Sequence, residues 1–194
     1  YAVHAIDVDG DGDIDILSAS VDDDTIAWYE NDDSENFTEH IITTSADGAR
    51  DVYAKDVDGD GDIDVVSASY EDDTLAWYKN DGSENFTEIA IATNLDGAQN
   101  IYVEDMDADG DIDVLVTVFL ADKITMFRND GSENFSENIV YSSEQGCDGP
   151  QSIIAADIDS DGDMDVAASI RYRHRVYWVE NLMECEEGFD CAGI

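Results

Sequence analysis

The chain has 194 residues, of which 49 are acidic and 8 are basic, so its formal net charge at pH 7 is −41. A protein this acidic repels nucleic acid, and it has no apolar run long enough to insert directly into a membrane. Apolar residues still make up 43% of the chain, which is enough for a core. An acidic surface of this kind suits salty or calcium-rich surroundings, where charges are strongly screened. With no Met and no signal peptide at its start, the chain is expected to be a mature form or an excerpt.

The first distinctive segment, residues 7–15, has Asp at every second position and Gly12 at the sixth. Two like charges about 4 Å apart repel by roughly 4 kcal/mol at an effective dielectric constant near 20. Ca²⁺ takes six to eight oxygen ligands, and helix–loop–helix calcium loops use alternating positions with glycine at the sixth. The segment therefore predicts a calcium site. Its last carboxylate, Asp15, stands at position 9, so the loop is shorter than a helix–loop–helix calcium loop.

The same acidic loop recurs three times, at residues 56–64, 105–113 and 157–165. The four loops start at 7, 56, 105 and 157, so the spacings are 49, 49 and 52 residues. Such a period indicates a repeat protein. We divide the single domain into four repeats, at approximately 1–46, 47–95, 96–147 and 148–194.

Each repeat is expected to form four short strands. In the second repeat these are residues 51–55, 63–70, 74–79 and 86–93, separated by polar turns. No segment has a convincing helical period, which indicates an all-β protein. Because several strands are apolar on both faces, each sheet should be covered on both sides. Four-stranded units of this length predict a β-propeller, either a four-bladed ring or a propeller-like arc. A two-sheet sandwich would not explain the regular period.

These loops resemble those of the FG-GAP/VCBS repeat family, whose calcium-binding blades also occur in integrin alpha-chain heads. Residues 28–32 and 77–87 also look typical of microbial members. The resemblance implies about four Ca²⁺ ions, each between strands one and two of a blade, and a secreted or cell-surface location. It implies carboxylate ligands at loop positions 1, 3, 5 and 9, and a backbone carbonyl at position 7 whose side chain is free. Integrin heads have seven blades, whereas this chain has four repeats. The expected metal-site residues are Asp7, Asp9, Asp11, Asp13, Asp15, Asp56, Asp58, Asp60, Asp62, Asp64, Asp105, Asp107, Asp109, Asp111, Asp113, Asp157, Asp159, Asp161, Asp163 and Asp165.

The fourth repeat departs most from the pattern, because Arg171, Arg173 and Arg175 place three of the eight basic residues within five positions. One interpretation is local charge balancing by neighbouring acids. The other is a docking patch for an acidic partner, either a second copy of this protein or an anionic glycan. The acidic runs at 22–24 and 71–73 are interpreted as solvated turns.

Trp28, Trp77 and Trp178 recur at one repeat position and are expected to be core residues between blades, rather than platforms for sugar rings. The three cysteines allow a Cys185–Cys191 bridge, a bridge from Cys147 to either of them, or free thiols.

Three triplets, which begin at Asn36, Asn85 and Asn134, fit the N-glycosylation pattern. They occupy one repeat position, so the alternative to glycosylation is that duplication copied a single chance triplet.

Catalysis is poorly supported. The histidines His4, His40 and His174 occupy different repeat positions, and no nucleophile motif or phosphate-binding glycine loop is present. We therefore expect a non-enzymatic extracellular calcium-binding module that acts in structure, adhesion or self-assembly at a surface. The alternative is a carbohydrate-binding domain or a fragment of a secreted polysaccharide-degrading enzyme.

Overall fold

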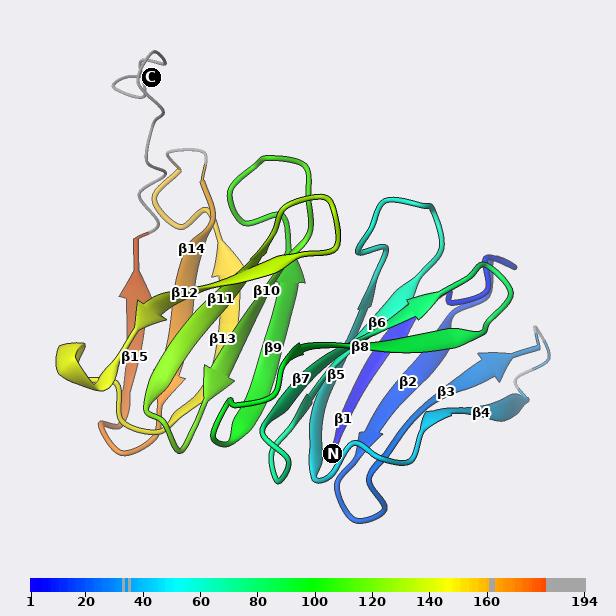
Figure 1. Cartoon of the computed structure of the whole chain (residues 1–194), viewed down its shortest axis with the longest axis horizontal. Coiled ribbons are helices and arrows are strands. Elements are labelled where there is room, and N and C mark those ends of the chain that lie inside the picture. The colour runs from blue at the N-terminus through cyan, green and yellow to red at the C-terminus, as the bar shows by residue number, and fades with distance from the viewer. Residues whose placement is uncertain (33, 35, 161–162, 181–194) are drawn as a thin grey trace.

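The computed structural model describes residues 1–32, 34, 36–160 and 163–180. This part of the chain forms four antiparallel sheets, each built from strands that follow one another in the sequence (Figure 1). The first sheet comprises β1 (Ala2–Ile6), β2 (Asp15–Ser20), β3 (Thr25–Asn31) and β4 (Phe37–Thr43). The second comprises β5 (Ala49–Lys55), β6 (Asp64–Ser69), β7 (Thr74–Asn80) and β8 (Phe86–Ala92).

The third sheet comprises β9 (Ala98–Glu104), β10 (Asp113–Val118), β11 (Lys123–Asn129) and β12 (Phe135–Tyr141). A short 3₁₀ helix, η1 (Ser143–Gln145), precedes the fourth sheet of β13 (Pro150–Ala156), β14 (Asp165–Ile170) and β15 (Arg175–Val179). The all-β prediction is confirmed, and the four strands expected in the second repeat occur with small differences at their ends. The fourth strand of the last repeat would fall among residues 181–194, outside the described residues.

The four sheets lie side by side in an open row, with the first and the fourth at opposite ends (Figure 1). The innermost strands β1, β5, β9 and β13 contact one another in sequence along the row. The sequence predicted either a closed ring or an open arc of sheets. The described residues form an open arrangement that does not close on itself. The four acidic loops lie along one side of this row (Figure 1).

Hydrophobic core fills each space between neighbouring sheets. Trp28 and Leu17 of the first sheet pack with Val52 and Val65 of the second. Trp77 fills the equivalent space between the second and third sheets. Because a core lies on each side of the second and third sheets, every residue of β6 and of β10 is buried. This explains why these strands are apolar on both faces.

One core prediction is wrong. Trp28 and Trp77 are 1% and 0% exposed, but Trp178 is 49% exposed, since the described residues place no further sheet on its side of the fourth sheet. Cys147 is buried between the third and fourth sheets and forms no disulfide with a described residue. Cys185 and Cys191 lie outside the described residues, and with them the predicted Cys185–Cys191 bridge and the alternative bridges from Cys147.

The acidic turns are more than solvated hairpins, because their last Asp joins consecutive repeats. The carboxylate of Asp24 accepts a hydrogen bond from the Gly48 backbone N–H (3.0 Å). Asp73 and Asp122 do the same for Gly97 (3.0 Å) and Gly149 (2.8 Å). All three Asp residues have positive φ, between 50° and 59°. Their spacing along the repeats is the signal that could have revealed this role.

Candidate metal centres

Each acidic loop connects the first two strands of its sheet and brings three carboxylates together. The aspartates at positions 1, 3 and 9 place one oxygen each within 4.8 Å of the others in all four loops. The four groups are Asp7, Asp9 and Asp15; Asp56, Asp58 and Asp64; Asp105, Asp107 and Asp113; and Asp157, Asp159 and Asp165. Twelve of the twenty predicted residues therefore converge in sets of three.

The aspartate at position 9 anchors the loop from inside the protein. In the first sheet, the fully buried Asp15 accepts hydrogen bonds from the backbone N–H of Val8 (2.9 Å) and of Asn31 (2.8 Å). Asp64 and Asp113 accept from equivalent donors in their own repeats. This carboxylate thus ties the start of the loop to the end of the third strand. That interior position could not be distinguished from the other Asp positions in the sequence.

The aspartates at positions 1, 3 and 5 shape the loop through short-range hydrogen bonds. Asp7 accepts from Gly10 N–H (2.8 Å) and Gly12 N–H (3.0 Å), Asp9 accepts from Asp11 N–H (3.1 Å), and Asp11 accepts from Asp13 N–H (2.8 Å). The glycine at position 6 has φ of 101° in the first loop, a conformation that other residues rarely adopt. Nothing lies within 4 Å of a Cβ built on Gly12, so backbone conformation rather than space requires this glycine.

Positions 5 and 7 lie outside the three-carboxylate groups. At position 5, Asp60 and Asp109 accept backbone hydrogen bonds like Asp11, while Asp161 is outside the described residues. At position 7, the side chains of Asp62 and Asp111 lie close to the loop that follows the third strand. A Cβ built on Gly82 would lie 2.5 Å from Oδ2 of Asp62, and one on Gly131 would lie 2.6 Å from Oδ2 of Asp111. These two carboxylates therefore pack against the loop that follows the third strand.

The donor sets fit a hard cation. In the third loop, Oδ1 of Asp105 and Oδ1 of Asp107 are buried without a hydrogen-bond partner among the described residues. Burial raises the pKa of Asp64 and of Asp113 to about 6, despite the backbone donors that lower it. Burial likewise raises the pKa of Asp9 and of Asp107. Buried carboxylates that converge on one point are stabilised in their charged form when a cation is shared among them.

Basic residues meet two of the four centres. Lys79 forms ion pairs with Asp58 and with Glu133 of the next repeat, and hydrogen bonds to these carboxylates raise the Lys79 pKa. Arg128 pairs with Asp107 in the third repeat (3.2 Å). The equivalent positions in the first and fourth repeats hold acidic residues, Glu30 and Glu180. The four centres therefore fall into two electrostatic classes.

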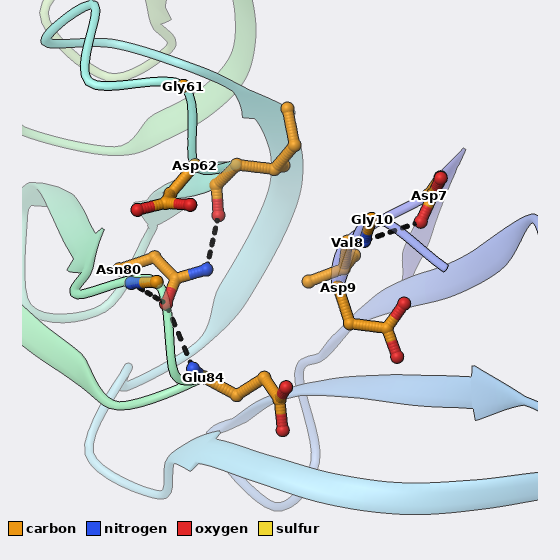
Figure 2. A pocket seen from close by; sticks show the side chains of 10 residues that line it. Asp7, Val8, Asp9, Gly10, Gly61, Asp62, Asn80 and Glu84 are labelled. Carbon is orange, nitrogen blue, oxygen red and sulfur yellow. Dashed lines mark hydrogen bonds between the residues drawn. The ribbon is translucent and has the colours of Figure 1, made fainter. Parts of the chain in front are cut away.

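A small polar hollow of about 80 Å³ separates the first acidic loop from the second repeat. Figure 2 shows the carboxylates of Asp9, Asp62 and Glu84 around it, and Asn80 at its wall. Asn80 holds the loops on its side, since its amide donates to the Ile63 carbonyl (3.2 Å) and its Oδ1 accepts from Gly82 N–H (3.2 Å) and Glu84 N–H (3.1 Å). The first centre is thus open toward the neighbouring repeat.

The other predicted residues are separate from these centres. Arg173 pairs with Asp148 (3.2 Å), which is the predicted local charge balance, whereas Arg171 stacks over Phe119 and Tyr172. Arg175 forms no ion pair with any described residue.

The amides of Asn36, Asn85 and Asn134 are exposed but donate to Asp32, Asp81 and Asp130, and this bonding lowers the pKa of those carboxyls. None of the histidines in the described part of the chain belongs to a metal-ligand group. Within the same residues, no helix has the length and apolar character needed to cross a membrane.

The repeats that contain these loops are similar to repeats of known proteins. The family model described as "FG-GAP-like repeat" matches residues 7–67, 56–116 and 105–168. A search of curated proteins found no match. Among solved structures, the chain is similar to the biofilm matrix protein Bap1 of V. cholerae, with 20% sequence identity and a TM-score of 0.49. That match covers 92% of this chain and 30% of the Bap1 chain, so the present sequence spans under a third of that protein.

Proposed function

We propose that this chain, which belongs to the FG-GAP-like repeat family, is a non-enzymatic structural module stabilised by calcium. It acts in adhesion or assembly outside the cell or at its surface. In this proposal its sheets are the blades of a propeller-like arc. The net charge of −41 supports a calcium-rich exterior, where the cation is abundant and the acidic surface is screened.

The observation that carries the proposal is the recurrence of one three-carboxylate group per sheet, at the same loop positions each time. Ca²⁺ would supply a partner for Oδ1 of Asp105 and Oδ1 of Asp107, which are buried without a hydrogen bond among the described residues. In each repeat the position 1 and position 3 aspartates come from the loop, while position 9 opens the second strand. An ion held by all three would fix the first two strands and the loop as one unit.

A calcium titration followed by thermal unfolding tests the proposal. A ligand that binds only the folded state stabilises it by about 2.7 kcal/mol per site when its concentration is about 100 times the dissociation constant. Extracellular calcium modules bind at about 10⁻⁴–10⁻³ M, so we expect the Tm to rise steadily through the millimolar range and to fall with a chelator.

The matched variants are Asp58→Asn, which removes a member of a three-carboxylate group, and Asp23→Asn, which removes the same charge from an exposed turn. The first should weaken the calcium-dependent rise in Tm, and the second should leave it intact. Melting curves that are identical with calcium and with chelator would contradict the proposed role.

A carbohydrate-binding role is the second candidate, and the observation that favours it is the exposure of Trp178 (49%) and Tyr172 (57%) on the fourth sheet. Exposed aromatic rings can stack on sugar rings. A glycan array with wild-type protein and Trp178→Ala separates the two candidates. Binding that depends on Trp178 would favour carbohydrate recognition.

A further inference from the structure

The two ends of the row of sheets expose apolar faces that have no partner among the described residues. We call the outer side of the fourth sheet the tail face, which contains Ile154, Val176 and Trp178, exposed by 55%, 76% and 49%. We call the outer side of the first sheet the head face. Its most exposed large side chain on β1 is Val3 (75%). Alternation along the strands places Ile16 and Tyr29 on the same side as Val3.

The exposed residues of the tail face occupy the same repeat positions that, in each earlier sheet, pack against the next sheet. Trp178 corresponds to Trp28, Trp77 and Met126, which are 1%, 0% and 6% exposed. Val176 corresponds to Ile26, Leu75 and Ile124, which are all 0% exposed. The tail face is therefore one half of an interface that the molecule already forms three times.

The head face corresponds to the other half of that interface. Val3 is equivalent to Val52, Ile101 and Ile153, which are only 2% to 3% exposed because the preceding sheet covers them. The two faces lie at opposite ends of the row, so one molecule cannot join them to each other (Figure 1). Two molecules can, because the tail face of one is complementary to the head face of another.

The charges around the two faces are also complementary. Turns of neighbouring sheets touch, as shown by the ring contacts of Phe119 with Tyr70 (6.3 Å) and with Tyr172 (5.9 Å). If a second copy continued the row, the acidic turn at 21–24 of its first sheet would meet the basic turn at 171–174 of the first copy. Arg171, Arg175 and His174 line a hollow of about 420 Å³ at the tail face that also includes Val176. Asp22 and Asp23 are exposed on the partner turn.

The fourth repeat lacks the carboxylate that anchors the connection between consecutive repeats. Asp24, Asp73 and Asp122 each bind the glycine N–H of the connection to the next repeat. The equivalent residue in the fourth repeat is His174, which has the same left-handed backbone (φ 51°) but no carboxylate. The tail face therefore keeps the packing surface and lacks the anchor for a following connection.

We propose that the tail face of one copy packs on the head face of a second copy, which continues the row of sheets across the molecular boundary. Such a heterologous contact produces either a closed ring of copies or an open filament. This inference rests on the proposed structural role, and it identifies the partner as a second copy of the same chain. Its test is a measurement of association, whereas the calcium proposal is tested by stability, so each can fail alone.

Sedimentation velocity of the full chain, at roughly 1–100 µM protein, covers the affinities at which such interfaces form dimers. Calcium at about 5 mM exceeds the dissociation constants expected for extracellular modules. We expect the wild-type protein to form dimers or longer species as its concentration rises. Val176→Glu at the tail and Val3→Glu at the head should each leave mostly monomer.

The matched control is Ile139→Glu, which alters another exposed apolar residue (63%) on the third sheet, in the middle of the row. It should associate like the wild type. Circular dichroism should show unchanged folding for all three variants, since each substituted side chain is exposed.

Mixing the two blocked variants gives the decisive result. Val3→Glu keeps an intact tail and Val176→Glu keeps an intact head, so an equimolar mixture should recover a one-to-one dimer that neither variant forms alone.

A second experiment reverses the charges of the two turns. Arg171→Glu with Arg175→Glu should weaken association at least tenfold, because acidic turns would then face each other. Asp22→Arg with Asp23→Arg in the partner should restore it.

Three outcomes would overturn the proposal. These are a wild-type chain that stays monomeric throughout the range, association that Ile139→Glu disrupts equally, and a mixture of blocked variants that remains monomeric. The first would exclude a second copy as the partner of these two faces.

Discussion

The interior sheets and the end sheets of this protein contain the same repeat but occupy different environments. Trp77, between the second and third sheets, is fully buried, whereas Trp178 on the fourth sheet is half-exposed. Val52 is buried under the first sheet, whereas the equivalent Val3 is 75% exposed. A repeat of this kind cannot bury both of its faces alone, because each core is shared by two sheets. The burial of a side chain therefore depends on the position of its sheet in the row rather than on the residue type.

The largest expected effect comes from truncating the same aromatic position in the two environments. Trp77→Ala should destabilise the protein by about 3–5 kcal/mol, because it removes a fully buried side chain and leaves a cavity. Trp178→Ala should cost less than about 1 kcal/mol at low protein concentration. Urea unfolding in the presence of calcium measures both. Equal losses would mean that Trp178 is covered in the monomer.

A smaller difference is expected for the aspartates that join consecutive repeats. Asp122→Ala removes the acceptor for Gly149 N–H and should cost about 1–2 kcal/mol. His174→Ala is the matched control, since both residues have positive φ (50° and 51°) and alanine is strained equally at each. Urea unfolding should show little change for the control beyond that strain. A loss as large for His174→Ala would mean that backbone strain, not the hydrogen bond, explains the result.

Calcium removal should loosen the first acidic loop more than the second. Lys79 offsets the charge of Asp58 in the second repeat, but Glu30 occupies the equivalent position in the first. Hydrogen exchange followed by mass spectrometry, with and without a chelator, should show a several-fold larger rate increase for residues 7–15 than for 56–64. Lys79→Gln should reduce that difference. If both loops respond alike in wild-type protein, Lys79 does not act as an internal counter-ion.

The smallest effect at neutral pH concerns Cys147, in the interface between the third and fourth sheets. Burial raises the pKa of its thiol to about 11. In the unfolded chain the thiol has a pKa near 8.5, so it loses its proton at a lower pH than in the folded chain. Between about pH 9 and 11 the folded state therefore binds more protons than the unfolded state, and stability should fall as the pH rises. Cys147→Ala should remove this part of the pH dependence, measured by urea unfolding.

Thiol labelling gives an independent check on the same residue. In a background of Cys185→Ser and Cys191→Ser, Cys147 should react slowly at pH 8 when folded and quickly in urea. Rapid labelling of the folded protein would indicate that the interface between the third and fourth sheets opens readily.

Much of the fold could be predicted because its information is local. The spacing of the acidic loops defined the repeats, and the short apolar segments between polar turns predicted the strands. The sequence also identified the loops that hold the candidate metal centres. It could not separate position 9 from position 5, since both are Asp. Only the fold shows that Asp64 is buried against two backbone donors while Asp60 stays with its own loop.

The acidic turns show the same limit. Asp22, Asp23 and Asp24 are chemically identical in the sequence, but only Asp24 accepts the hydrogen bond from Gly48 of the next repeat. That contact depends on how consecutive sheets stack, which residue type does not reveal.

By itself, the sequence determined the repeat, the all-β class and the acidic loops, because turn formation and strand alternation depend on neighbouring residues. The tertiary structure alone decided which equivalent positions are core and which are surface. Trp77 and Trp178 differ in exposure because a core between sheets requires a second sheet, and the described residues supply that sheet only to Trp77.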